Sequence, residues 1–132
     1  MGLTDHNRGG HSRARESRQA VVDCAEIYMR NHLADRVSIS RLCRMLGRSE
    51  RGLRSAFYAA HGMSPTRWLL AERLLATRMA LVADERRAVT VTEIATRYGF
   101  YELGRFSAAY RAAFGETPSE TLRAPVRSQA AA

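Results

Sequence analysis

Apolar residues recur along this chain at helical spacing, and one arrangement of them occurs twice. In each copy two apolar residues four apart precede a glycine, and after a short polar gap a second pair follows it. The first copy contains Leu42, Leu46, Gly47, Leu53 and Phe57, and the second contains Ile94, Tyr98, Gly99, Phe106 and Tyr110. The copies lie about 52 residues apart, with one residue inserted just after the second glycine, so the pattern predicts two copies of one supersecondary unit.

Each copy is predicted to fold as a helix, a tight turn and a second helix. Gly47 and Gly99 stand where the first helix has to end in a left-handed residue, which glycine adopts without steric cost. Ser49 offers a hydroxyl that caps the second helix of the first copy. A helix-turn-helix presents its second helix to the major groove of DNA. The same pattern is also compatible with two ordinary helical hairpins in a bundle.

The remaining apolar pattern predicts two longer helices. One runs from about Ser17 to Leu33 and packs on the first helix-turn-helix. Its apolar residues are Val21, Val22, Ala25, Ile27, Tyr28 and Met29. The other helix begins at Ser64 and Pro65 and ends near Val82. The predicted fold is therefore all-α, with two helix-turn-helix subdomains joined by a long central helix, about seven helices in total. Residues 1–16 are expected as a disordered tail or linker remnant, residues 17–124 as the domain, and residues 125–132 as a frayed C-terminus.

The run from Val91 to Arg123, VTEIATRYGFYELGRFSAAYRAAFGETPSETLR, resembles the second helix-turn-helix of AraC/XylS-type transcription regulators. The matching positions are Gly99, Phe100, Phe106, Tyr110, Arg111, Phe114, Gly115 and Pro118. The first copy resembles the more variable first motif of that family, and the resemblance covers roughly residues 20–123. It implies the C-terminal DNA-binding domain of such a regulator, which binds double-stranded DNA as a monomer. Family members commonly carry an effector or dimerisation domain ahead of this module, so the chain is either an excised fragment or a single-domain regulator.

The charge of the chain favours a polyanionic partner. Twenty-one basic residues, all of them arginine, face thirteen acidic ones and give a net charge of +8. The absence of lysine is compatible with two interpretations that do not exclude each other: the composition of a GC-rich genome, and a use of the guanidinium group to bind guanine and phosphate in bidentate fashion. From Arg36 to Arg67 there are seven arginines and one acid, whereas from Val89 to Arg123 four arginines balance four glutamates. The alternative to a DNA-binding regulator is a helical protein-interaction module with an arginine-rich soluble surface.

The candidate DNA contacts of the first copy lie on the outer face of its second helix. Periodicity turns Leu53 and Phe57 inward, and the family resemblance assigns base contacts to Arg51, Arg54 and Ser55. Arginine binds the O6 and N7 atoms of guanine, so a G-containing half-site is expected. Phosphate contacts are assigned to Arg44, Arg48 and Tyr58. The alternative is that these arginines contact no DNA and only form part of a solvated surface.

The second copy is expected to discriminate bases poorly. Its outward candidates for base contact are Leu103, Ser107 and Ala108, of which only Ser107 can form a hydrogen bond to a base, while the other two can touch a thymine methyl group. Arg105 and Arg111 are placed for phosphates. RNA polymerase is an alternative partner for this surface, by the family resemblance.

The central helix sets the expected target. About 18 residues span roughly 27 Å, and with its turns such a helix can hold two recognition helices about one DNA turn apart, roughly 34 Å. Because the two motifs differ in sequence and follow one another head to tail, an asymmetric site is expected, bent if the helix is rigid.

Other functions lack a supporting pattern. No apolar run is long enough to cross a bilayer and no signal-peptide core is present, so the protein is expected in the cytoplasm, at the nucleoid. Cys24 and Cys43 are predicted to be reduced, buried thiols, and the histidines lack the spacing of a metal site. Ser49, Ser64 and Ser119 are expected as helix caps rather than nucleophiles. No catalytic site, metal or cofactor is therefore expected.

Overall fold

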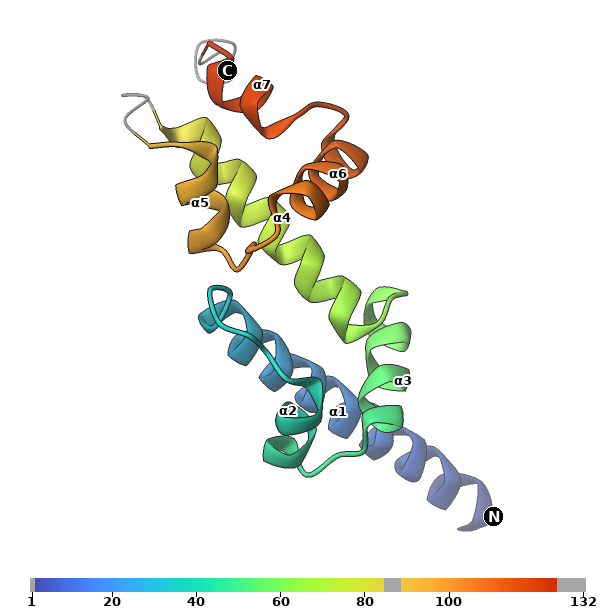
Figure 1. The fold of residues 1–132 in the computed structure, drawn as a ribbon. Helices are drawn as coiled ribbons and strands as arrows, with labels where there is room; N and C mark the ends of the chain where they lie inside the picture. Colours follow the sequence, from blue (N-terminus) through green and yellow to red (C-terminus); the bar gives the residue numbers. More distant parts are fainter. Residues whose placement is uncertain (1, 85–88, 126–132) are drawn as a thin grey trace. The chain divides into compact units, whose positions relative to one another are not determined.

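The computed structural model describes residues 2–84 and 89–125, and side chains from residue 13 onward. The described residues form seven helices and no strand, which confirms the predicted all-α class (Figure 1). The helices are α1 (Gly2–Asn31), α2 (Ile39–Leu46), α3 (Glu50–His61), α4 (Pro65–Ala83), α5 (Val91–Arg97), α6 (Leu103–Phe114) and α7 (Pro118–Arg123).

The chain divides into two compact units, each with one helix-turn-helix. The first unit comprises residues 1–32 and 37–69, and the second comprises residues 33–36 and 70–132. The motif of the first unit is α2 and α3, and that of the second is α5 and α6. Helix α4, with 19 residues, begins in the first unit and continues into the second. At 1.5 Å per residue it is about 28 Å long, close to the length expected from the sequence.

The core of the first unit forms where α1 packs against α2 and α3 (Figure 1). Helix α1 contributes a stripe of three buried residues at a helical period of three and four, and the partner helices supply large apolar side chains. The buried residues are Val22, Ala25, Met29, Leu42, Cys43, Leu53, Ala56, Phe57, Trp68 and Leu69. The ring of Trp68 meets Phe57 edge-on, with 5.9 Å between the ring centroids. This packing fixes the orientation of α3.

Local capping chemistry determines where the helices begin and end. Gly47 closes α2 in the left-handed conformation (φ 66°), as predicted. Ser49 caps α3 by accepting a hydrogen bond from the Gly52 amide at 3.0 Å, and Ser64 caps α4 in the same way. The prediction for Ser119 is wrong. Thr117 caps α7 instead, because it forms a capping box with the glutamate three residues later, and α7 begins at the proline between them.

Helix α1 departs from the sequence prediction at three places. A disordered tail was predicted over residues 1–16, whereas α1 begins at Gly2. Once a packed segment has nucleated a helix, each added residue costs little, and residues 13–16 include alanine, arginine and glutamate, which favour helices. Cys24 is exposed rather than buried, and Ile27 is 60% exposed. Both lie off the Val22, Ala25 and Met29 stripe, on the side of α1 away from α2 and α3. The frayed end predicted at residues 125–132 lies outside the described residues beyond Pro125.

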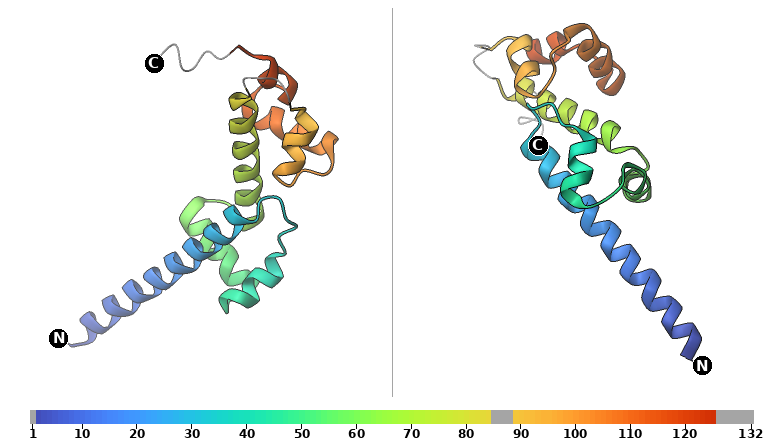
Figure 2. Two further views of the ribbon diagram at one scale, coloured as in Figure 1. Left: turned by 90° about the vertical axis from the view of Figure 1, so that its left-hand side faces the viewer. Right: turned by 60° about the horizontal axis from the view of Figure 1, so that its bottom comes forward.

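The second unit gathers α5, α6 and α7 around the C-terminal half of α4 (Figure 2). Leu74 and Leu81 of α4 pack against the helix-turn-helix, and its fully buried residues are Ile94, Ala95, Phe106 and Tyr110. The Tyr110 hydroxyl donates a hydrogen bond of 2.7 Å to Thr121 Oγ1, so the phenol is buried without an unpaired polar atom.

Residues 33–36 belong to this unit because Arg73 holds them. Its guanidinium donates to the backbone carbonyl oxygens of Leu33 (3.0 Å) and Asp35 (2.7 Å), and the Tyr101 hydroxyl donates to the Ala34 carbonyl. Burial lowers the pKa of Arg73 from its usual value. Gly99 follows the end of α5 with φ 94° and lies against the Leu33 carbonyl and the Arg73 side chain. The left-handed conformation predicted for Gly99 is confirmed, and the space around it also excludes a side chain.

Candidate nucleic-acid interface

Helix α3 has one buried face and one face open to solvent. Leu53 and Phe57 are buried, as predicted, and Ala56 is buried beside them. On the opposite side Arg51 and Ser55 are exposed and the side chain of Tyr58 is 54% exposed. At 3.6 residues per turn these three lie within about 60° of one another around the helix axis. Arg51, Ser55 and Tyr58 therefore form a single outward surface, which we call the α3 face.

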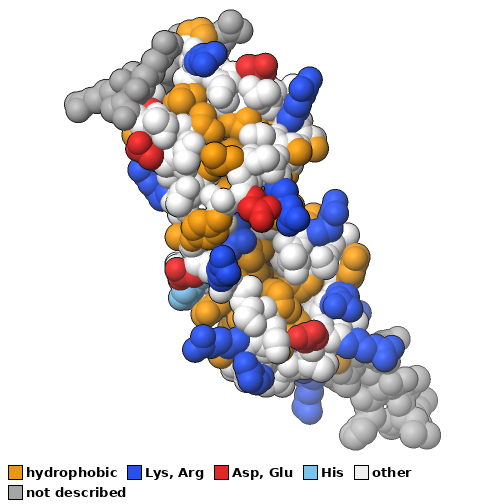
Figure 3. All heavy atoms as spheres, in the orientation of Figure 1, with side chains coloured by type: hydrophobic (Ala, Val, Ile, Leu, Met, Phe, Trp, Pro, Cys, Tyr) orange, Lys and Arg blue, Asp and Glu red, His pale blue; other side chains and the backbone are white. Residues whose placement is uncertain are grey.

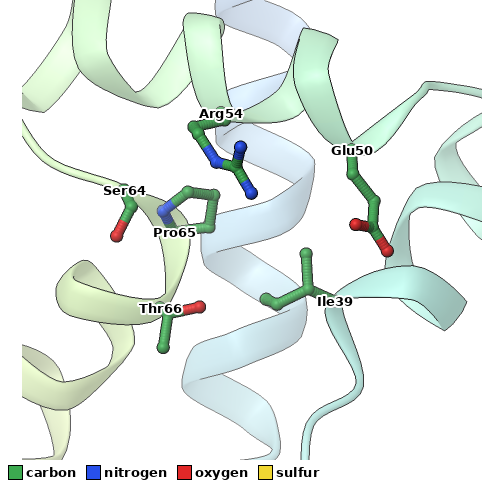
Figure 4. A pocket seen from close by; sticks show the side chains of 6 residues that line it. All are labelled: Ile39, Glu50, Arg54, Ser64, Pro65 and Thr66. Atoms are coloured by element: carbon green, nitrogen blue, oxygen red, sulfur yellow. The ribbon is translucent and has the colours of Figure 1, made fainter.

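Arg54 lies at the edge of the α3 face. It is exposed, but its guanidinium points into a pocket at the junction of α3 and the start of α4 (Figure 4). The pocket is lined by Ile39, Glu50, Arg54, Ser64, Pro65 and Thr66. Within the described part of the chain, neither Arg51 nor Arg54 forms an ion pair with a carboxylate. Of the two arginines predicted to contact bases, Arg51 is thus the more central and Arg54 the more lateral.

Two of the residues predicted to contact phosphates in the first unit, Arg44 and Arg48, lie outside α3, whereas the third, Tyr58, belongs to the α3 face. Arg44 is exposed in the last turn of α2. Arg48 is exposed in the turn between α2 and α3, where its guanidinium donates a hydrogen bond to the Ser17 hydroxyl of α1. A neutral hydroxyl leaves the positive charge of Arg48 uncompensated. This contact could not be predicted from the sequence, because the partners lie 31 residues apart.

A second interaction, also missed from the sequence, fixes the far end of α3. His61 Nε2 contacts the Glu26 carboxylate of α1, and these two side chains are only 29% and 15% exposed. The His61 ring also lies 5.8 Å from the Trp68 ring, measured between centroids. Glu26 and Arg48 together tie α1 to both ends of α3. The Glu26–His61 contact is part-buried and the Arg48–Ser17 contact is exposed, and both hold α3 in place against α1.

Helix α6 presents a less polar outer face. Phe106 and Tyr110 are buried, whereas Ser107 and Ala108 are exposed and Leu103 is 42% exposed. All three predicted base contacts of the second copy therefore face solvent, and one hydroxyl is the only hydrogen-bonding group among them. Helix α6 lies in the second unit and α3 in the first.

The charges of the second unit are largely compensated. Arg105 pairs with Glu102 at 3.0 Å on an exposed surface, while Arg111 is exposed. Glu116 forms an ion pair with Arg78 at 3.1 Å, and Glu120 forms the capping box of α7 together with Thr117. The surface in Figure 3 shows arginine side chains spread over the visible face of the first unit, which carries the excess positive charge.

The described residues provide neither a membrane-spanning helix nor a cluster of metal ligands. Among them, no helix combines the length and the apolar character needed to cross a membrane. No group of three or more histidine, cysteine or acidic side chains is arranged there to hold a metal ion. Burial raises the pKa of the Cys43 thiol above its usual value, and the negative charge of Glu50 contributes to the same shift.

Comparison with known proteins identifies the architecture. A family model described as a helix-turn-helix domain matches residues 42–124. The XylDLEGF operon transcriptional activator of Pseudomonas putida is 36% identical over 96 residues, which cover 73% of this chain and 30% of the activator. A probable thc operon regulatory protein of Rhodococcus erythropolis is 35% identical over 103 residues, covering 78% of this chain and 31% of that protein. The chain thus matches about a third of the length of these relatives.

A solved structure supports the same assignment. The crystal structure of a probable AraC family transcriptional regulator from Rhodopseudomonas palustris superimposes with a TM-score of 0.71 at 35% identity. The match covers 79% of this chain and 95% of that structure. The chain therefore belongs to the AraC/XylS family of transcription regulators, and its two helix-turn-helix motifs form a DNA-binding domain of that family.

Proposed function

We propose that this protein is a sequence-specific regulator of transcription in which α3 reads base edges in the major groove of double-stranded DNA. The observation that carries the proposal is the α3 face, where Arg51 and Ser55 point outward from a helix that is capped at its start and packed along its opposite side. Arg51 donates hydrogen bonds to guanine O6 and N7, and the Ser55 hydroxyl forms a hydrogen bond with a neighbouring base. Arg54 reaches the edge of the same major groove. The P. putida relative is named as a transcriptional activator, and activation is the outcome we propose for this chain.

The positive charge around α3 supports a set of phosphate contacts. Arg44, Arg48 and Tyr58 bind the DNA backbone on either side of the recognition helix and fix its register without reading sequence. Because Arg48 is held by Ser17, its guanidinium loses little freedom when it binds a phosphate. In the second unit Arg105 and Arg111 take the same role more weakly.

A single chain carries two recognition helices, so we propose that it binds DNA as a monomer. Helix α6 enters the next major groove, where Ser107 bonds to a base and Leu103 and Ala108 touch thymine methyl groups. Two different motifs in one chain require an asymmetric site of about 16 to 20 base pairs. Bending the DNA to meet both helices costs on the order of a few kcal/mol. RNA polymerase is the second partner that we propose for the α6 surface, and the cytoplasmic nucleoid is the proposed place of action.

Selection from a randomised duplex library tests the assignment of base contacts. Arg51→Ala is expected to weaken binding to the selected site by about 1 to 3 kcal/mol and to relax preference at particular base pairs. Arg54→Ala is expected to do the same at the edge of the half-site. Arg111→Ala serves as the matched control, because loss of a phosphate contact weakens all sequences alike. If both α3 variants lost affinity uniformly across the library, these arginines would be phosphate contacts and the proposal of base readout would be wrong.

Salt dependence separates this function from a protein-interaction module. Phosphate contacts release counterions, so the DNA affinity of the wild-type protein has to fall steeply between 50 and 200 mM salt. Binding to random duplex DNA that is absent, or insensitive to salt, would instead favour an interaction module whose arginines only keep it soluble.

A further inference from the structure

The buried stripe of α1 continues toward the N-terminus as arginine. Residues 15, 18, 22, 25 and 29 follow one another at intervals of three and four, so they lie on one side of the helix, within about 80° around its axis. The last three, Val22, Ala25 and Met29, are buried against α2 and α3. Arg18 lies on the same side of α1 one turn before Val22, and Arg15 lies there two turns before it. Both are exposed. We call these two residues the α1 arginine pair.

The α1 arginine pair borders the recognition helix. Arg15 and Arg18 line a groove together with Ala56, Ala59 and Ala60 of α3. Ala59 is exposed and lies one turn beyond Ser55 on the DNA-facing side of the helix. Because alanine side chains are small, they do not separate these guanidinium groups from a ligand bound to α3.

A neighbouring contact fixes this part of α1 beside the helix-turn-helix. Ser17, which lies between the two arginines, accepts the hydrogen bond from Arg48 in the turn before α3. The α1 arginine pair is therefore attached to the same rigid unit as the α3 face. On the other edge of α3, Arg54 points toward the start of α4. Arginine side chains thus lie at both edges of the recognition helix, and those of the α1 arginine pair are the ones without an assigned base contact.

We propose that α1 is a further DNA-contacting element, in which Arg15 and Arg18 bind backbone phosphates flanking the half-site of α3. This inference rests on the proposed function and extends it to α1, for which the sequence predicted only packing on the first helix-turn-helix. The occupant is the DNA backbone, because Arg15 and Arg18 lie beside the recognition helix and not on the α3 face, and guanidinium groups in that position are complementary to phosphate. The contribution is consequently independent of base sequence.

The test compares salt slopes on one duplex that extends at least one helical turn beyond the half-site. Each phosphate contact contributes about 0.9 to the slope of log K against log salt, so Arg15→Gln/Arg18→Gln is expected to lower the slope by about 1.8. The ratio of affinities at 50 and 200 mM salt then shrinks about tenfold. Arg15→Lys/Arg18→Lys keeps the charges and retains the slope. The base preferences of the library selection stay unchanged in both variants.

Arg13→Gln is the matched control. Arg13 lies on the same helix but on the opposite side from the stripe, so its removal changes the net charge without removing a phosphate contact. Circular dichroism and thermal unfolding verify that every variant folds. A slope equal to that of the wild type in Arg15→Gln/Arg18→Gln, or an equal loss per charge in Arg13→Gln, would overturn the proposal and leave the pair to α1 packing or to another acidic partner. Salt-insensitive wild-type binding would refute the proposed function itself, a different result.

Discussion

Gly99 and Gly47 occupy equivalent places in the two motifs, and replacing each by alanine separates two reasons for glycine. Both have positive φ, 94° and 66°. A Cβ atom at Gly47 would meet nothing within 4 Å, so Gly47→Ala adds only the cost of a left-handed conformation, about 1 to 2 kcal/mol. A Cβ atom at Gly99 would overlap the Leu33 carbonyl oxygen and lie 2.8 Å from Arg73 Nε. Gly99→Ala therefore also disrupts the anchor of residues 33–36.

The additional cost follows from the bond that has to move. Arg73 Nε donates to the Leu33 carbonyl at 3.0 Å, and a hydrogen bond that involves a charged group is worth about 1.5 to 3 kcal/mol. Gly99→Ala is consequently expected to destabilise the second unit by about 3 to 4 kcal/mol, roughly 2 kcal/mol more than Gly47→Ala destabilises the first. With a urea m-value of about 2 kcal/mol/M, the difference corresponds to about 1 M in the unfolding midpoint.

Urea unfolding followed by two probes measures this difference. Far-UV circular dichroism reports on the helices of both units, whereas fluorescence of Trp68, the single tryptophan, reports on the first. Gly47→Ala should shift the fluorescence transition and Gly99→Ala the remaining dichroism transition. If Gly99→Ala cost no more than Gly47→Ala, the close approach of residues 33–36 to Gly99 would not exist in solution.

Two further predictions concern charge. Arg44→Gln/Arg48→Gln should flatten the salt dependence of DNA binding more than Arg105→Gln/Arg111→Gln, because an ion pair already compensates Arg105; a larger effect of the second pair, measured on one operator, would mean that α6 holds the DNA more firmly. Burial raises the pKa of Tyr110, so its stabilising contribution is complete below its unfolded pKa of about 10 and is lost as pH rises through the higher folded pKa. Tyr110→Phe should therefore cost about 1 kcal/mol at neutral pH and less at alkaline pH in chemical denaturation, and a cost independent of pH would contradict this.

Local chemistry made much of the fold predictable from the sequence. The internal repeat, the positive φ of Gly47 and the serine caps of α3 and α4 depend on residues within a turn of one another. The same holds for the two faces of α3, because a helical period fixes which side chains are opposite the core. The cap of α7 was assigned wrongly because serine and threonine compete within three residues, and Thr117 has a glutamate at the correct spacing for a capping box.

Contacts between distant segments were not predictable. Arg73 donates hydrogen bonds to backbone carbonyl oxygens about forty residues earlier in the sequence, in residues 33–36. No sequence pattern predicts hydrogen bonds of this kind, because any backbone carbonyl can accept them. The exposure of Cys24 depends on which side of α1 meets α2 and α3. Likewise, Arg15 and Arg18 line a groove with α3 only because α1 continues as a helix beyond its buried stripe. The DNA contact that we propose for α1 therefore depends on the tertiary path of this helix and not on either motif alone.

Hydroxyl-radical footprinting of the wild-type protein on its selected site tests the central claim most directly. The account predicts one chain per duplex and two protected tracts of different sequence, about one helical turn apart on the same side of the DNA. Their protection should fall together as salt increases. A palindromic footprint that requires two chains, or a single protected tract, would contradict binding by two recognition helices of one chain.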